Sequence, residues 1–327
     1  MKPRVSVALL FPSLWFFAAC HADVLVAPLA IRSAEMKTPS AEQTDLARHA
    51  STSFREALYA ARYESLPNVR QLLTAAYLEN PSDPEVALLL GHAHLWTLSE
   101  RSRVGDEVGP EITDHALLAE HYFGEASTLA PEDDRIPGWQ GGARLAIGDI
   151  HDDQRATRRG YFQLREAVRA YPAFNGFSAG FVLSSQDRDS DRFAEAVELF
   201  WTNLAACAGD DRIREDLDYR GVSSRATTTG RLRVCWNTEL VPHNFEGFFL
   251  AMGDVLTKAG DVANAERAYR AAMLSPDYDG WRFAPVLEAR LANLDERVAA
   301  FAAAADPGEE PAMMFGSDYA CTGCHAR

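Results

Sequence analysis

Apolar residues recur at the spacing of amphipathic helices along most of this 327-residue chain. From about residue 46 to residue 305 they lie three and four positions apart, which places them on one face of a helix. Residues 281–305 follow this pattern, and we expect one helix there that caps the helical region. Its apolar face carries Val286, Leu287, Leu291, Leu294, Val298 and Phe301. The pattern predicts an all-α fold.

Residues 250–276 contain the clearest helical hairpin, with the sequence LAMGDVLTKAGDVANAERAYRAAMLSP. Gly253 and Ala265 are small enough to let two antiparallel helices approach closely, and Gly260 marks the turn between the helices. Tyr269 is large enough to fill the gap to a neighbouring helix pair. The unit resembles a tetratricopeptide (TPR) repeat.

Weaker copies of this unit occur upstream. They are marked by the small residues Ala76, Gly91, Ala126, Gly142 and Gly180. With a first helix over residues 54–64, the copies indicate about five hairpins. The resemblance implies a TPR-like antiparallel helix-hairpin solenoid over residues 46–305, since one hairpin cannot bury its apolar face without a stacked neighbour. It also implies a groove that binds a protein partner.

Several stretches interrupt the repeats. We expect an irregular insertion at about residues 207–245 and shorter ones near residues 101–113 and 149–159. Residues 306–311, DPGEEP, are charged and break helices, which is typical of a linker. Residues 306–327 are therefore expected to form a linker and a short C-terminal tail.

The first residues are typical of an export signal. A short basic start precedes an apolar run over residues 5–17, and small residues follow. The run is too short to span a bilayer comfortably and no comparable run recurs, so we expect no transmembrane helix. We expect a signal peptide over residues 1–22 and a flexible linker over residues 23–45.

The end of the signal allows two cleavage sites. Residues 17–20, Phe-Ala-Ala-Cys, resemble a bacterial lipobox, although Leu is usual in place of Phe17. That resemblance implies cleavage before Cys20, lipidation of Cys20 and a membrane-anchored lipoprotein of the bacterial periplasm. Ordinary cleavage after Ala22 is the alternative.

Export also affects the interpretation of two other cysteines. Outside the cytoplasm, Cys207 and Cys235 are expected to form a disulfide. It would close a loop of about 29 residues and stabilise the fold by about 3 kcal/mol on the chain-entropy model. Two unpaired buried thiols are the alternative.

The charge of the chain limits its partners. The formal net charge is −15 at pH 7, and no run of Lys and Arg offsets it. Electrostatic repulsion therefore argues against nucleic acid and anionic membrane surfaces as binding partners. An acidic surface fits a basic partner protein, or it serves solubility alone.

The sequence CTGCH at residues 321–325 carries the chemistry of the chain. One turn of chain places both cysteines on one side, with the histidine next to them. The motif resembles the attachment signal of c-type cytochromes. The resemblance implies one covalent haem c, with thioethers to Cys321 and Cys324 and with His325 as the proximal iron ligand.

Other uses of these three residues remain open. Cys321 and Cys324 are also suited to a redox disulfide, but no βαβ pattern of a thioredoxin-like fold accompanies them. With His325 they are suited to a zinc site, but no second Cys/His pair with finger-like spacing is present.

The distal haem ligand also stays open. Met313 and Met314 precede the motif, yet two methionines beside Phe315 also suit a hydrophobic anchor that docks the tail. The histidine candidates are His92, His94, His121 and His243. None of these residues is assigned as the ligand from sequence.

Together these features favour an exported, lipid-anchored monohaem c-type protein. Its solenoid is expected to bind a redox protein or a membrane complex, and its haem to transfer single electrons. The alternative is an interaction scaffold or an assembly factor for a redox complex, in which the haem is structural or sensory. No nucleophile elbow, phosphate-binding loop or HExxH motif indicates an independent enzymatic activity, and no catalytic residue is assigned.

Overall fold

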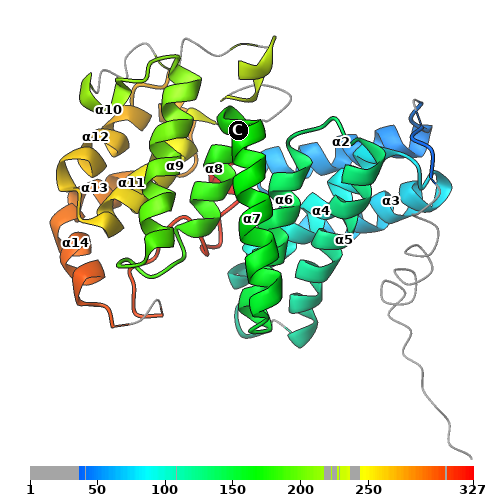
Figure 1. Cartoon of the computed structure of the whole chain (residues 1–327), viewed down its shortest axis with the longest axis horizontal. Coiled ribbons are helices and arrows are strands. Elements are labelled where there is room, and N and C mark those ends of the chain that lie inside the picture. Colours follow the sequence, from blue (N-terminus) through cyan, green and yellow to red (C-terminus); the bar gives the residue numbers. More distant parts are fainter. Residues whose placement is uncertain are drawn as a thin grey trace, which may run out of the picture. The chain divides into compact units, whose positions relative to one another are not determined.

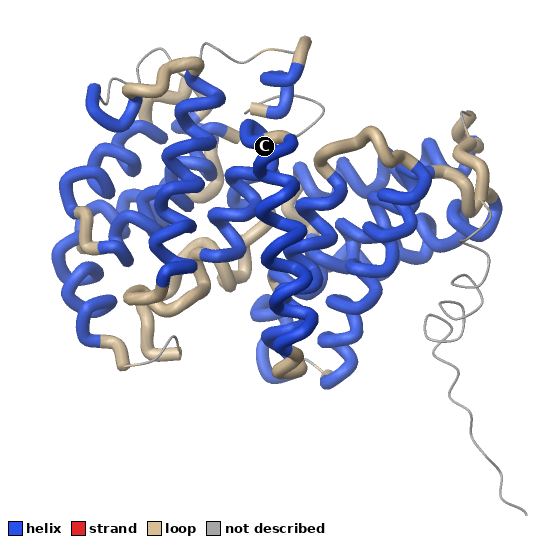
Figure 2. Tube along the Cα trace, viewed as in Figure 1, coloured by secondary structure: helices blue, strands red, loops and turns tan. Residues whose placement is uncertain are grey.

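Helices make up the fold of the residues that the computed structural model describes, which are 37–40, 42–107, 109–216, 222, 227, 229–235, 244–305 and 308–327. No strand occurs among them (Figure 2). Contacts divide the chain into Met1–Lys37 and Thr38–Arg327, and the helices of the described residues belong to the second unit. The predicted signal peptide with Cys20, most of the predicted linker and His243 lie outside the described residues.

Consecutive helices pack against each other in pairs (Figure 1). The pairs are α2 (Asp45–Tyr59) with α3 (Leu66–Glu79), α4 (Pro84–Ser99) with α5 (Asp114–Leu129), α6 (Ile136–Ile150) with α7 (Gln154–Ala170), α8 (Pro172–Leu183) with α9 (Asp191–Ala208), and α11 (Phe245–Ala259) with α12 (Val262–Ala272). The predicted all-α class is confirmed, and the paired arrangement is compatible with a helical repeat.

Close approach within the pairs depends on glycine at two positions. A Cβ atom on Gly91 would overlap the Phe123 ring, and one on Gly253 would overlap the Tyr269 ring. Both rings are buried. In the pairs α4–α5 and α11–α12, the second helix therefore packs an aromatic side chain directly on the backbone of the first.

Capping side chains set helix starts that the apolar pattern misses. Thr44 accepts a hydrogen bond from Ala47 N, so α2 begins at Asp45, and the expected first helix over residues 54–64 is wrong in its bounds. Asp153 accepts bonds from two backbone N–H groups and starts α7 at Gln154. The insertion expected near residues 149–159 is therefore reduced to a short turn.

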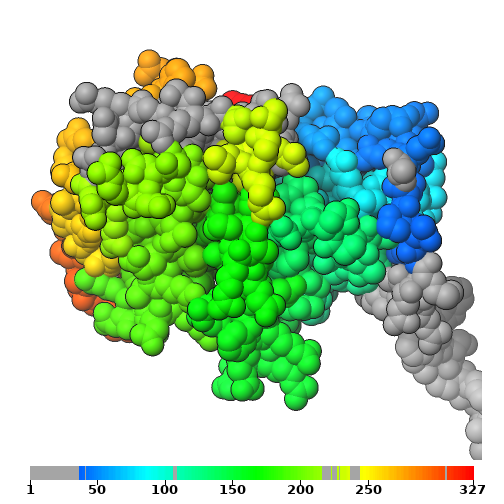
Figure 3. Space-filling model, turned by 45° about the horizontal axis from the view of Figure 1, so that its top comes forward, coloured from blue at the N-terminus to red at the C-terminus, as the bar shows by residue number. Residues whose placement is uncertain are grey.

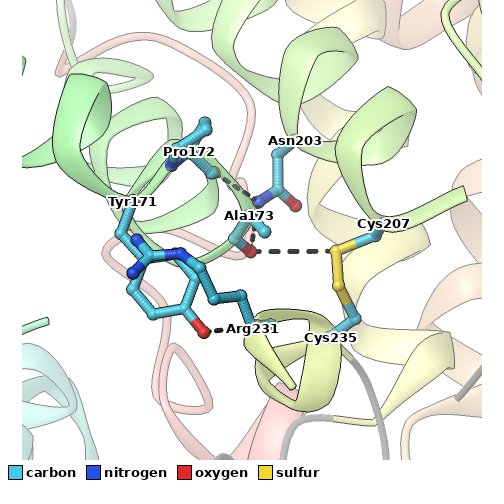
Figure 4. The surroundings of a disulfide bond; sticks show 7 residues. All are labelled: Tyr171, Pro172, Ala173, Asn203, Cys207, Arg231 and Cys235. Carbon is cyan, nitrogen blue, oxygen red and sulfur yellow. Dashed lines mark hydrogen bonds between the residues drawn. A yellow bond between two sulfur atoms is a disulfide. The ribbon is translucent and has the colours of Figure 1, made fainter. Parts of the chain in front are cut away.

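The predicted disulfide between Cys207 and Cys235 is confirmed (Figure 4). It joins the end of α9 to a short turn of 3-10 helix, η7 (Arg231–Val234), and the two Cα atoms lie 5.7 Å apart. Beside it, the Tyr171 hydroxyl donates to the Arg231 carbonyl, and the Arg231 guanidinium lies 3.9 Å from the centre of the Tyr171 ring. A disulfide indicates a non-cytoplasmic location.

The end of the helical region is two helices and not the single one expected over residues 281–305. α13 (Ala284–Ala292) and α14 (Leu294–Ala303) are separated at Asn293, whose φ of −110° and ψ of 24° are not helical. Leu287 and Phe301 are both buried, one in each helix, so the apolar pattern continues across the break. No helix in the described ranges is long and apolar enough to cross a membrane.

Candidate functional site

The segment over residues 308–327 packs into the fold and ends in the helical turn α15 (Thr322–His325). Met313 and Met314 are buried in the main apolar cluster, and so is Cys324. This packing favours the hydrophobic anchor over the haem ligand as the role of the two methionines. On the face shown in Figure 3, the last residues, in red, are visible only as a small patch.

A buried ion pair fixes the first half of this segment. Asp254 of α11 and Arg290 of α13 lie 2.8 Å apart. Asp254 also accepts a bond from Met314 N at 2.7 Å, and Arg290 donates to the Tyr319 hydroxyl at 2.6 Å. Burial alone would lower the pKa of Arg290, but Asp254 and Tyr319 raise it above its usual value, so the guanidinium stays charged.

Glu100, the residue after α4, holds the CTGCH turn. Its Oε1 atom accepts hydrogen bonds from Cys321 N at 2.9 Å, Thr322 N at 2.7 Å and Thr322 Oγ1 at 2.9 Å. Its Oε2 atom lies 2.8 Å from Arg103 Nε, and Arg103 also donates to Thr322 Oγ1. Glu100 is completely buried, so these bonds replace the hydrogen bonds to water that its side chain loses on folding.

The other side of the turn is bonded to the start of α11. Asn244 donates from its backbone to the Cys324 carbonyl at 2.6 Å and from its side chain to the Ala326 carbonyl at 3.0 Å. Its Oδ1 atom caps α11 by accepting from Gly247 N at 2.7 Å. Sequence reasoning missed both Glu100 and Asn244. Only the capping position of Asn244 before α11 leaves a signal in the local sequence.

The CTGCH turn borders a cavity of about 390 Å³. Cys321 and His325 line it, together with side chains from α2, α4, α6 and α8. The apolar lining includes Phe54, Leu58, Leu88, Leu89, Leu95, Trp96, Ile136, Trp139 and Phe174. Arg55 and Arg135 also border the cavity, each paired with a carboxylate: Glu85 and Asp133, respectively.

Two polar groups in the cavity wall are notable. Trp96 Nε1 is buried and has no hydrogen-bond partner among the described residues. The His92 ring contacts Phe123 and Trp139 edge-on, with ring centres 5.1 and 4.9 Å away. Burial, together with the nearby charges of His325 and Arg135, lowers the pKa of His92 to about 3. His92 is therefore neutral at physiological pH.

Both cysteines of the motif are free thiols. Burial raises the pKa of both thiols, and the Glu100 charge raises that of Cys321 further, so both are protonated at neutral pH. Cys321 borders the cavity. The Cys324 side chain packs in the core one turn later and is not part of the cavity lining.

The other described histidine candidates lie elsewhere. His94 Nδ1 and His115 Nδ1 are 2.7 Å apart, and the His94 ring stacks on Tyr122. His121 Nε2 lies 3.6 Å from a Glu125 carboxylate oxygen. Neither His94 nor His121 lines the cavity, and His92 does. Within the described ranges, no group of three or more His, Cys, Asp or Glu side chains is placed to hold a metal ion, so the zinc alternative gains no geometric support.

The chain matches no known protein-family model, no curated protein and no solved structure. The chemistry of the site follows from its own residues. They combine two thiols, two imidazoles, two guanidinium groups and a mainly apolar wall around one cavity and the turn beside it.

Proposed function

We propose that the chain is an exported c-type haem protein that binds a protein partner and transfers single electrons. One haem c would be held by thioethers to Cys321 and Cys324, with His325 as the proximal iron ligand. The observation that carries this proposal is that Cys321 and His325 of the CTGCH motif line the same largely apolar cavity.

The residues around the cavity suit a haem. Its flat macrocycle is apolar and its two propionates are anionic. The aromatic and aliphatic walls suit the macrocycle, and the guanidinium groups of Arg55 and Arg135 suit carboxylates. The unpaired N–H of Trp96 offers a further donor.

Attachment requires thiols, and both motif cysteines are thiols. Thioether formation would replace the S–H bond of each cysteine and one vinyl double bond by a C–S and a C–H bond, so Cys321 and Cys324 could hold the haem without an oxidant. When bound, the haem supplies a one-electron iron couple. The hydrogen bonds from Cys321 N and Thr322 N to Glu100 hold the turn that carries His325.

The helix pairs are proposed to be a TPR-like solenoid whose surface binds the partner. Support comes from the packing of Phe123 on Gly91 and of Tyr269 on Gly253, where the repeat pattern predicts close helix contacts. The net charge of −15 favours a basic protein, such as a redox protein or a component of a membrane complex. Export to the periplasm and a lipid anchor at Cys20 belong to the same proposal, and the disulfide supports export.

Burial of the motif turn favours a second candidate function. Thr322, Gly323 and Cys324 are buried, and partners from both halves of the chain hold the turn. A haem at this place would join distant helices and would serve as a structural or sensory element of an interaction scaffold or assembly factor. Redox titration separates the two: a reversible one-electron couple supports electron transfer, and a haem that cannot be reduced reversibly supports the scaffold.

Haem attachment is tested with the full chain, exported from a bacterium that matures c-type cytochromes. We expect the pyridine-haemochrome spectrum of one covalent haem per chain. The triple variant Cys321→Ala, Cys324→Ala, His325→Ala should lose it, and His151→Ala, which changes an exposed histidine, should keep it. No covalent haem in the wild type, or the same spectrum in the triple variant, would overturn the proposal.

A further inference from the structure

The cavity beside the CTGCH turn contains a second imidazole. His92 lies on α4 and His325 on the turn α15, and both line this cavity. They are the only histidines of the described part of the chain in its lining. Trp139 contacts the His92 ring and lines, with His325, both this cavity and a smaller one of about 50 Å³.

The ring nitrogens of His92 are available for a ligand. The ring makes edge-on contacts to Phe123 and Trp139 and no hydrogen bond to any residue of the described ranges. His94, two positions along the same helix, instead faces His115, with Nδ1 atoms 2.7 Å apart. An imidazole without a competing hydrogen-bond partner is a common iron ligand.

The methionines before the motif pack in the core of the fold. Met313 and Met314 lie in the main apolar cluster, and neither lines the cavity. Met314 N is bonded to Asp254, and a Cβ atom on Gly323 would overlap the Met314 side chain, so this methionine packs against the backbone of the turn. Of the ligand candidates that the structure describes, His92 alone shares the cavity with His325.

We propose that His92 is the second axial ligand of the haem, so that the iron is held by two histidines. This inference rests on the proposed haem attachment. With His92 and His325 both bound, the iron would be low-spin and closed to carbon monoxide, and its reduction potential would be lower than with a His/Met pair. Such a site is a carrier of single electrons and not an open sensor of gases.

Ferric and ferrous spectra of purified holoprotein test the inference, with His92→Ala as the variant and His151→Ala as the control. Wild type and control should be low-spin and should not bind carbon monoxide. His92→Ala should become high-spin and bind carbon monoxide, and added imidazole should restore the low-spin spectrum. If His92→Ala does not accumulate, His92→Phe keeps the ring volume without a nitrogen ligand and serves as the same test.

Pyridine-haemochrome measurement on every variant separates the failure of this ligand assignment from the failure of the proposed haem attachment. Absence of covalent haem from the wild type overturns the proposed function and the ligand assignment together. Covalent haem with a low-spin, carbon monoxide-resistant spectrum in His92→Ala overturns the ligand assignment alone. A wild type that is already high-spin and binds carbon monoxide also overturns the ligand assignment alone.

Discussion

Two segments outside the helix pairs are attached to the fold in different ways. In the described part of the segment after α9, the disulfide Cys207–Cys235 supplies a covalent link, and Arg231 adds contacts to Tyr171. The segment over residues 308–327 is held by buried charges and backbone hydrogen bonds, chiefly through Glu100, Asn244 and Asp254. A disulfide tolerates almost any chain between its ends, but hydrogen bonds fix the position of each residue they touch. Buried hydrogen bonds along residues 314–326 therefore fix the position of the segment that carries CTGCH.

The largest loss is expected when the charge that holds the turn is removed. Glu100→Ala leaves the partly buried Arg103 without its carboxylate and the N–H donors of Cys321 and Thr322 without their acceptor, and we expect a loss of about 3 kcal/mol or more in the free energy of unfolding. Urea unfolding measures the loss. Hydrogen exchange should show that the amides of residues 320–327 lose protection first.

Two matched variants sharpen the Glu100 experiment. Glu100→Gln keeps an acceptor oxygen and should lose less stability than Glu100→Ala. Glu64→Ala removes an exposed carboxylate and should change stability by less than about 0.5 kcal/mol. If Glu100→Ala were as stable as Glu64→Ala, contacts other than those of Glu100 would hold the CTGCH turn.

The contribution of the disulfide is tested by the double variant Cys207→Ser, Cys235→Ser. We expect a loss of about 3 kcal/mol, because the unfolded chain regains the freedom of the closed loop. In hydrogen exchange, faster exchange should concentrate near η7 and leave the amides of residues 320–327 protected. Equal loss of protection in both segments would show that the two attachments act as one.

Acid should destabilise α4, the helix that Glu100 follows, without breaking the disulfide. Burial, with the charges of His115, Arg70 and His121, lowers the pKa of His94 well below its usual value. The unfolded chain therefore binds a proton that the folded chain excludes, and stability is lost as the pH falls below about 6.5. One such group contributes roughly 1 kcal/mol per pH unit.

The pH effect is measured on protein without haem, from urea unfolding between pH 7 and pH 5. His94→Gln should unfold with a smaller slope against pH than the wild type, and His151→Ala should keep the wild-type slope. An unchanged slope in His94→Gln would assign the dependence to other groups.

The smallest loss is expected at the other side of the turn. Asn244→Ala removes the cap of α11 and one side-chain bond to the Ala326 carbonyl, but its backbone bond to Cys324 remains. We expect a loss of about 1–2 kcal/mol by urea unfolding. Asn244→Asp, which keeps the capping oxygen but not the N–H donor, should fall between the wild type and Asn244→Ala.

Local patterns in the sequence predicted the local parts of this fold. Small residues such as Gly253 marked close helix contacts, and the cysteine count indicated the disulfide. The pattern failed at Asn293, because the apolar stripe runs on through a break whose two sides both face the core. It also failed at residues 149–159, where the cap at Asp153 decides the helix start.

The site depended on contacts that no local pattern contains. CTGCH identified Cys321, Cys324 and His325, but nothing near Glu100 in the sequence indicates that it holds a turn 221 positions away. His92 was one of several histidine candidates until the cavity separated it from His94 and His121. Helix propensity and spacing describe neighbours along the chain, and this cavity is built from elements far apart in it.

The bonds from Glu100 to Cys321 and Thr322 also have a consequence for the order of folding. Contacts between residues this far apart require the closure of a very long loop, which costs chain entropy before any bond forms. The helix pairs can assemble from contacts between near neighbours, so the turn is expected to dock after them. Until it docks, Cys321 and Cys324 remain open to solvent and to reagents. The interval before docking is therefore the time at which their chemistry can take place.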